Sequence, residues 1–111
     1  MAKRKIRVEP GSGNVFKDLG YADAEERTLK VQLAVEVNRL LGSRGLTQDA
    51  AAKLLGIRQP HVSDLARYRL ERFSAERLMG FLVGLGQEVE IRIRARPARG
   101  SRAAVRVLHG T

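Results

Sequence analysis

One stretch of the chain, residues 47–67, constrains the fold more than any other. It reads TQDAAAKLLGIRQPHVSDLAR, and Gly56 divides it into two short apolar patterns that each fit a helix. The apolar residues of the two patterns are, in order, Ala51, Ala52, Leu55, Ile57, Val62 and Leu65. A glycine tolerates the positive φ that a tight turn between helices requires. The stretch therefore predicts two short helices joined at Gly56, with Ala52 small enough for the second helix to cross the first.

The second predicted helix has an apolar face and a polar face. Val62 and Leu65 are three residues apart and would turn inward together. Its polar residues are Gln59, His61, Ser63, Asp64 and Arg67. A helix of this kind can enter the major groove of DNA as the second element of a helix-turn-helix. An ordinary helical hairpin is the alternative, but the small residue, the glycine turn and the two apolar sets in register favour a DNA-binding motif.

Length and composition bound the class of protein. A chain of 111 residues is long enough for one domain with a modest core. It has no cysteine, which excludes a disulfide framework and a thiolate metal site. No apolar run approaches the roughly 20 residues that span a bilayer, and no apolar stretch follows the charged N-terminus as in a signal peptide. We therefore expect a protein of the prokaryotic cytoplasm.

The net charge of +9 is concentrated at the two ends of the chain. Residues 1–13 carry four basic residues and one acidic residue, and residues 92–111 carry six arginines and no acidic residue. The middle of the chain is neutral. Basic ends suit an anionic polymer such as nucleic acid, although solvated disordered ends have the same composition. We expect residues 1–13 and 95–111 to be flexible basic tails around a domain formed by residues 14–94.

Helix start and stop signals surround the central motif. Asp23 can cap a long helix, and Gly45 is a left-handed stop for it. Thr47 can cap the first helix of the motif, and Ser74 can cap a further helix that ends at Gly86. These signals predict a mainly α fold of four to five helices.

Residues 87–94, QEVEIRIR, alternate between polar and apolar residues and therefore predict a β-strand at the C-terminal end of the helical domain. A lone strand is not stable, so we expect it to pair, antiparallel, with the same strand of a second copy. In one register of this self-pairing, each charged residue faces a residue of opposite charge and each apolar residue faces another apolar residue. The facing pairs there are Glu90 with Arg92, Glu88 with Arg94 and Val89 with Ile93, with Ile91 opposite its own copy. The alternative is a hairpin within one chain, with residues 5–9 or 104–108 as the partner.

Residues 14–94 resemble the Xre-type helix-turn-helix proteins and, more narrowly, the HigA-like antitoxins of type II toxin–antitoxin modules. The motifs that carry the resemblance are NVFKDLG at 14–20, LTQDAAAKLLGIRQPHVSDL at 46–65 and FSAERLMGFLVGLGQEVEIRIR at 73–94. The resemblance implies a homodimeric repressor that autoregulates its operon by binding an inverted-repeat operator in double-stranded DNA. It also implies a partner, a RelE/ParE-like ribonuclease toxin that the antitoxin neutralises. A stand-alone Xre-type regulator with no toxin partner is the alternative.

The resemblance also assigns roles to individual residues. The expected DNA-binding residues are Gln48, Arg58, Gln59, His61, Ser63, Asp64, Arg67 and Arg69. Gln48 would contact a phosphate, Gln59 a base edge and Arg67 the DNA backbone. A glutamine amide can pair bidentately with adenine, which agrees with the role of Gln59, while a merely solvated surface position is the alternative for each of these residues. Arg58 departs from the family, which often has serine as the N-cap there, and offers a cation instead.

A short apolar segment precedes the long predicted helix. Residues 14–20 carry Val15, Phe16 and Leu19, which either fold back on the core or contact a partner. In an antitoxin these three are the expected toxin contacts, since a stand-alone regulator has no use for an exposed apolar segment there. A small basic reading frame adjacent to the gene would support the antitoxin.

No catalytic, metal or cofactor site is expected. The two histidines, His61 and His109, are far apart in the sequence, and one of them belongs to the expected DNA-binding surface. The sequence contains no nucleophile constellation, metal-ligand cluster or glycine-rich phosphate loop. We therefore expect neither an enzyme nor a bound cofactor.

Overall fold

The computed structural model describes residues 23–95 and 105–110 of the chain. Within these residues the chain forms four helices: α2 (Asp23–Ser43), α3 (Gln48–Leu55), α4 (Gln59–Ala66) and α5 (Ala75–Gly84). The mainly helical fold that the sequence predicts is confirmed for this part of the chain. Residues 14–20 and the N-terminal tail lie outside the described residues.

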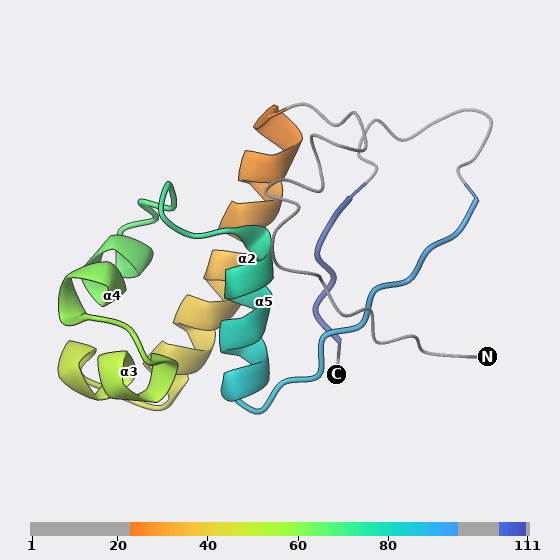
Figure 1. The fold of residues 1–111 in the computed structure, drawn as a ribbon. Coiled ribbons are helices and arrows are strands. Elements are labelled where there is room, and N and C mark those ends of the chain that lie inside the picture. The colour runs from red at the N-terminus through yellow and green to blue at the C-terminus, as the bar shows by residue number, and fades with distance from the viewer. Residues whose placement is uncertain (1–22, 96–104, 111) are drawn as a thin grey trace.

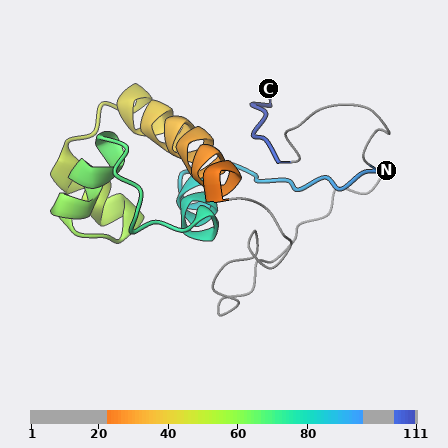
Figure 2. The same cartoon turned by 90° about the horizontal axis from the view of Figure 1, so that it is seen from above.

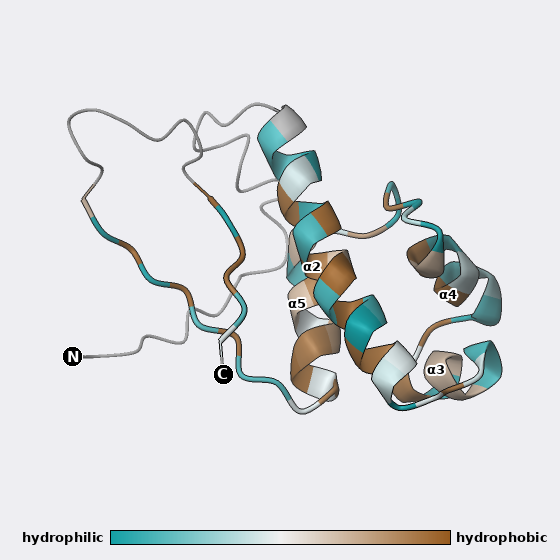
Figure 3. Cartoon of the chain, turned by 180° about the vertical axis from the view of Figure 1, so that it is seen from behind, coloured by the Kyte–Doolittle hydropathy of each residue, from teal (hydrophilic) through white to brown (hydrophobic). Residues whose placement is uncertain are grey.

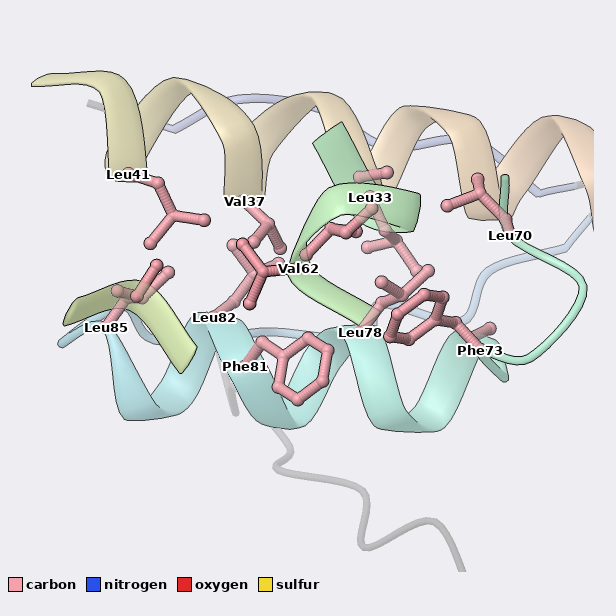
Figure 4. Close-up of a cluster of buried hydrophobic side chains, with 14 of the residues drawn as sticks. Leu33, Val37, Leu41, Val62, Leu70, Phe73, Leu78, Phe81, Leu82 and Leu85 are labelled. Atoms are coloured by element: carbon pink, nitrogen blue, oxygen red, sulfur yellow. The ribbon is translucent and has the colours of Figure 1, made fainter. Parts of the chain in front are cut away.

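The core lies between α2 and α5, which pack along each other, with α3 and α4 on one side of this pair (Figures 1 and 2). Both helices carry apolar residues at helical spacing, and Figure 3 shows hydrophobic residues gathered along them. The buried residues from the two helices are Leu29, Leu33, Ala34, Val37, Leu41, Ala75, Leu78, Phe81 and Leu82. In Figure 4 the labelled side chains of α2 point toward those of α5. Burial of this apolar area is the main force that stabilises the domain.

Among the described residues Phe73 is the largest fully buried side chain, and it lies two positions before α5. Its ring packs edge-on against the ring of Phe81, with centroids 5.9 Å apart and planes at 73°. The guanidinium of Arg77 lies 5.5 Å from the centroid of Phe73 and 5.7 Å from that of Phe81, in a cation–π arrangement with both rings. This cluster attaches the loop that follows α4 to the core.

The helix ends agree with the sequence signals. Thr47 Oγ1 accepts a hydrogen bond from the Ala50 N–H at 3.1 Å, and Ser74 Oγ accepts one from the Arg77 N–H at 3.0 Å. Each hydroxyl satisfies a donor that has no partner within its own helix. Gly56 follows α3 with φ +70°, a conformation that a side chain would strain. The predicted turn at Gly56 is therefore confirmed.

Residues 87–95 continue from α5 without helix or strand. Their apolar side chains are half-buried or exposed, and Ile93 is 78% exposed. Within the described parts of the chain there is no strand, and residues 105–108 form no ladder with residues 87–95, so the hairpin with residues 104–108 finds no support there. A single copy cannot form the self-paired strand, which stays a prediction about the dimer.

Residues 105–110 lie against α2, although the sequence assigns them to a loose tail. The Val107 N–H donates to Gln32 Oε1 at 2.8 Å, and His109 Nδ1 lies 2.8 Å from Glu36 Oε1. Arg39 Nη2 donates to the same Glu36 oxygen at 3.0 Å. Partial burial raises the pKa of the Glu36 carboxyl, but the hydrogen bonds from Arg39 and His109 lower it more, so that the pKa lies below its ordinary value. Residues 87–95 and 105–110 both lie on the side of α2 and α5 that is opposite α3 and α4 (Figures 1 and 2).

Candidate nucleic-acid interface

α3 and α4 meet through the turn at Gly56 and leave one face of α4 outside (Figure 1). Ala51 and Ala52 of α3 and Val62 and Leu65 of α4 are buried. The two alanines are small, so the second helix can approach the first closely. The predicted helix-turn-helix is therefore confirmed in its local geometry, and the polar residues of α4 are left for an external partner.

The C-terminal end of α4 is attached to the long helix α2. Asn38 Nδ2 donates a hydrogen bond to the backbone carbonyl of Leu65 at 3.0 Å, across 27 residues of sequence. The same carbonyl accepts the N–H of Tyr68 at 3.1 Å. Carbonyls in the last turn of a helix lack partners within it, and Asn38 supplies one from the scaffold. This bond orients α4 relative to the core, and sequence reasoning missed it because Asn38 reads as an ordinary polar helix residue.

The first residues of α3 and α4, Gln48 and Gln59, contact each other. Gln59 Nε2 donates to Gln48 Oε1 at 3.3 Å, and both side chains are exposed. Gln59 keeps its own Oε1 and one N–H for an outside partner, and Gln48 keeps its Nε2 group. An amide oxygen and an N–H together are the groups that pair with the N6 and N7 positions of adenine. The pair therefore holds the Gln59 amide at the exposed start of α4 in a limited set of orientations.

The other residues of α4 that were predicted to bind DNA differ in how exposed they are. His61, Ser63 and Asp64 are half-buried, whereas Arg67, the C-cap of α4, is exposed. Arg58 occupies the N-cap position but makes no side-chain cap bond, and its side chain is exposed. The departure noted at this position thus leaves a cation, rather than a capping hydroxyl, at the start of the helix.

The chain leaves α4 through an unusual residue, Tyr68, whose φ is +61°. The Arg69 N–H donates to the Asp64 carbonyl at 2.8 Å, and the Tyr68 N–H to that of Leu65, so the two bonds close the helix as a left-handed cap does. Arg67 and Arg69 are exposed on either side of Tyr68. Tyr68 was not identified from the sequence, although the lack of a glycine just after the end of α4 is a signal for such a strained position.

Five exposed cations lie on α3, at the start and end of α4 and in the loop that follows α4. Lys53, Arg58, Arg67, Arg69 and Arg72 are all exposed. Arginine is charged at every physiological pH and offers several donors to phosphate oxygens. The cations lie on the α3–α4 part of the chain and on the loop after it, where a duplex that met α4 would present its backbone.

The described residues hold neither a candidate metal site nor a candidate membrane span. These contain no group of three or more histidine, cysteine, aspartate or glutamate side chains that could hold a metal ion. None of the described helices is both long enough and apolar enough to cross a membrane.

Comparison with known proteins agrees with the geometry. A family model described as a helix-turn-helix domain matches residues 15–94. A solved structure named "Putative XRE Family Transcriptional Regulator" is 47% identical in sequence, with a TM-score of 0.76. The match covers 80% of this chain and 100% of that one. No curated protein matches the sequence significantly.

Proposed function

The chain belongs to the Xre-type helix-turn-helix family, and on that premise we propose that it is a sequence-specific transcriptional repressor that reads DNA with α4. The observation that carries the proposal is the pair formed by Gln48 and Gln59 at the exposed starts of α3 and α4. Gln59 reads a base edge in the major groove, and Gln48 orients its amide and contacts a phosphate. Arg58, Arg67 and Arg69 contact the backbone on either side.

The repressor binds its operator as a homodimer, with one α4 in each half-site of an inverted repeat. The dimer forms through residues 87–94, paired about Ile91. Two facts support this arrangement. The segment lies on the side of α2 and α5 opposite α3 and α4, so pairing there leaves α4 uncovered (Figure 2). In the single chain Ile93 is 78% exposed, and opposite Val89 of a second copy it would be covered.

Replacement of Gln59 by alanine should weaken binding to the cognate duplex by about 1–3 kcal/mol and leave binding to random duplex nearly unchanged, because a base contact is lost. A cognate duplex can be selected from a random pool with the wild-type chain. Titration of both duplexes by fluorescence anisotropy measures the effect. Arg27→Ala is the control, since Arg27 is also exposed but lies in the first turns of α2, outside α3, α4 and the proposed dimer segment. An equal loss on both duplexes would contradict base reading by Gln59.

The same titrations at several salt concentrations separate base reading from phosphate contact. Arg67→Ala should weaken cognate and random binding alike and lower the slope of log affinity against log salt by about one unit. Arg27→Ala, which removes an exposed arginine from the first turns of α2, is the control and should leave the slope unchanged. An unchanged slope for Arg67→Ala would remove this residue from the interface.

We further propose that the repressor is an antitoxin that autoregulates its operon and neutralises a RelE/ParE-like ribonuclease, with Val15, Phe16 and Leu19 as the toxin contacts. The family match begins at residue 15 and so includes these three positions. The stand-alone regulator is equally consistent with that match, and it requires no ribonuclease partner.

A chain that lacks residues 1–20 should no longer neutralise the ribonuclease but should still bind the operator duplex. The assay is growth of cells that express the proposed RelE/ParE-like ribonuclease, with and without the deleted chain. Val15→Ser, Phe16→Ser and Leu19→Ser, combined in the full-length chain, provide a second variant. Thermal unfolding and duplex binding serve as controls for the fold. Full rescue of growth by both variants would rule out these contacts, and lost duplex binding would show that the segment belongs to the core.

A further inference from the structure

Tyr68 takes up a backbone conformation that glycine adopts without strain and that tyrosine does not. Among the described residues it is the sole non-glycine with positive φ, and the other positive-φ positions there are Gly45, Gly56 and Gly86. In the left-handed region the Cβ of an L-residue lies too close to the following carbonyl oxygen. A glycine at this position would form the same two backbone bonds that end α4. The end of the helix therefore does not require the tyrosine side chain.

Packing does not account for this side chain. Tyr68 is 44% exposed, whereas its apolar neighbours Leu65 and Leu70 are buried. Within the described residues its hydroxyl makes no hydrogen bond, so the polar end of the ring is free for an outside partner. Strained residues that the fold does not need are concentrated at functional sites.

The position of Tyr68 indicates its partner. It follows the C-cap of α4 directly and stands between two exposed arginines, Arg67 and Arg69. When a helix-turn-helix docks, the start of the recognition helix meets the base edges. The residues just past its other end then lie near the backbone that borders the groove. Tyrosine hydroxyls are among the groups that bind phosphate oxygens there.

We propose that Tyr68 donates a hydrogen bond from its hydroxyl to a backbone phosphate of the bound duplex, and this inference rests on the proposed DNA binding. The donor is neutral, so the contact adds affinity without displacing a counterion. It also orients α4 in the groove from the end opposite Gln59. Asn38 donates to the Leu65 carbonyl, which also accepts the Tyr68 N–H, so the scaffold holds the backbone from which the ring extends.

Tyr68→Phe tests the contact, because it removes the hydroxyl and keeps the ring and the backbone conformation. Cognate and random duplexes should both bind about tenfold more weakly, which corresponds to about 1.4 kcal/mol. The salt slope should stay that of the wild type, in contrast to Arg67→Ala, because no charge is removed. The midpoint of thermal unfolding should not change.

Three results would overturn the inference. Binding of both duplexes within twofold of the wild type would show that the hydroxyl has no partner on DNA. A loss confined to the cognate duplex would make the partner a base, and a thermal midpoint lowered by more than about 4 °C would make the hydroxyl part of the fold. Wild-type protein that binds no duplex at all is a separate outcome, because it refutes the proposed function before any variant is compared.

Discussion

Replacing both Arg92 and Arg94 by glutamate should convert the homodimer into a monomer and weaken operator binding about a hundredfold or more. In the proposed register each arginine faces a glutamate of the partner copy, and the symmetry axis repeats each pair. Reversal turns four attractive pairs into four repulsive ones, which should weaken the association of the two copies by about 30-fold or more. Two monomers then bind the two half-sites independently, and they lose the roughly 10²–10⁴-fold gain in operator affinity that comes from linking two DNA-binding units.

Compensating substitutions make this prediction specific to one register. A chain that also carries Glu88→Arg and Glu90→Arg should dimerise again, since the facing pairs are attractive once more. Sedimentation equilibrium on the wild type, the doubly reversed chain and the fully reversed chain measures the result. A fully reversed chain that stays monomeric would show that the proposed register is wrong.

A second experiment uses two chains that each repel themselves. One carries the arginine reversals alone, and the other carries the glutamate reversals alone. Each should be a monomer, but their mixture should form a heterodimer, because every facing pair is then of opposite charge. Monomers that stay apart when mixed would exclude residues 87–94 as the interface.

Phe73→Ala should lower the free energy of unfolding by about 3–5 kcal/mol, the usual cost of removing a buried aromatic side chain. Phe73 is 1% exposed, and the substitution also removes the edge-on contact with Phe81 and the cation–π contact with Arg77. The total free energy of unfolding of a small domain is about 5–15 kcal/mol, so the variant should be only marginally stable. Its thermal midpoint should fall by more than about 10 °C.

Val83→Ala is the matched control for this experiment. It also removes apolar side-chain atoms from the α5 region, but Val83 is 59% exposed and should change the free energy of unfolding by no more than about 0.5 kcal/mol. Urea titration followed by circular dichroism measures both variants. A cost for Phe73→Ala no greater than that for Val83→Ala would contradict the central place of Phe73 in the core.

The helices and their ends could be predicted because the signals for them act over a few residues. Thr47 and Ser74 cap the helices for which the sequence predicts them, and Gly56 makes the predicted turn. A cap bonds to a residue three positions ahead, and an apolar face repeats every three or four residues, so both are visible in the order of residues alone. The division of α4 into a buried face and a polar face follows from the same pattern, because its apolar positions, Val62 and Leu65, recur at helical spacing.

The extended parts of the chain could not be predicted in the same way. The alternation in residues 87–94 indicates a strand, but a strand exists only with a partner, and the single described chain offers none. Residues 105–110 looked like a loose basic tail, yet Gln32 and Glu36 hold them on α2. Nothing near residues 105–110 in sequence indicates those contacts, because their partners lie more than 70 residues away.

By itself, the sequence determined the mainly helical fold, the turn at Gly56 and the polar face of α4, since each depends on neighbouring residues within one or two helical turns. The tertiary structure alone decided how these parts form a site. It placed Gln48 against Gln59, joined Asn38 to the end of α4 and exposed the strained Tyr68 between two arginines. Such contacts arise when burial of the apolar faces brings distant segments together, and the order of residues does not record which polar groups then meet.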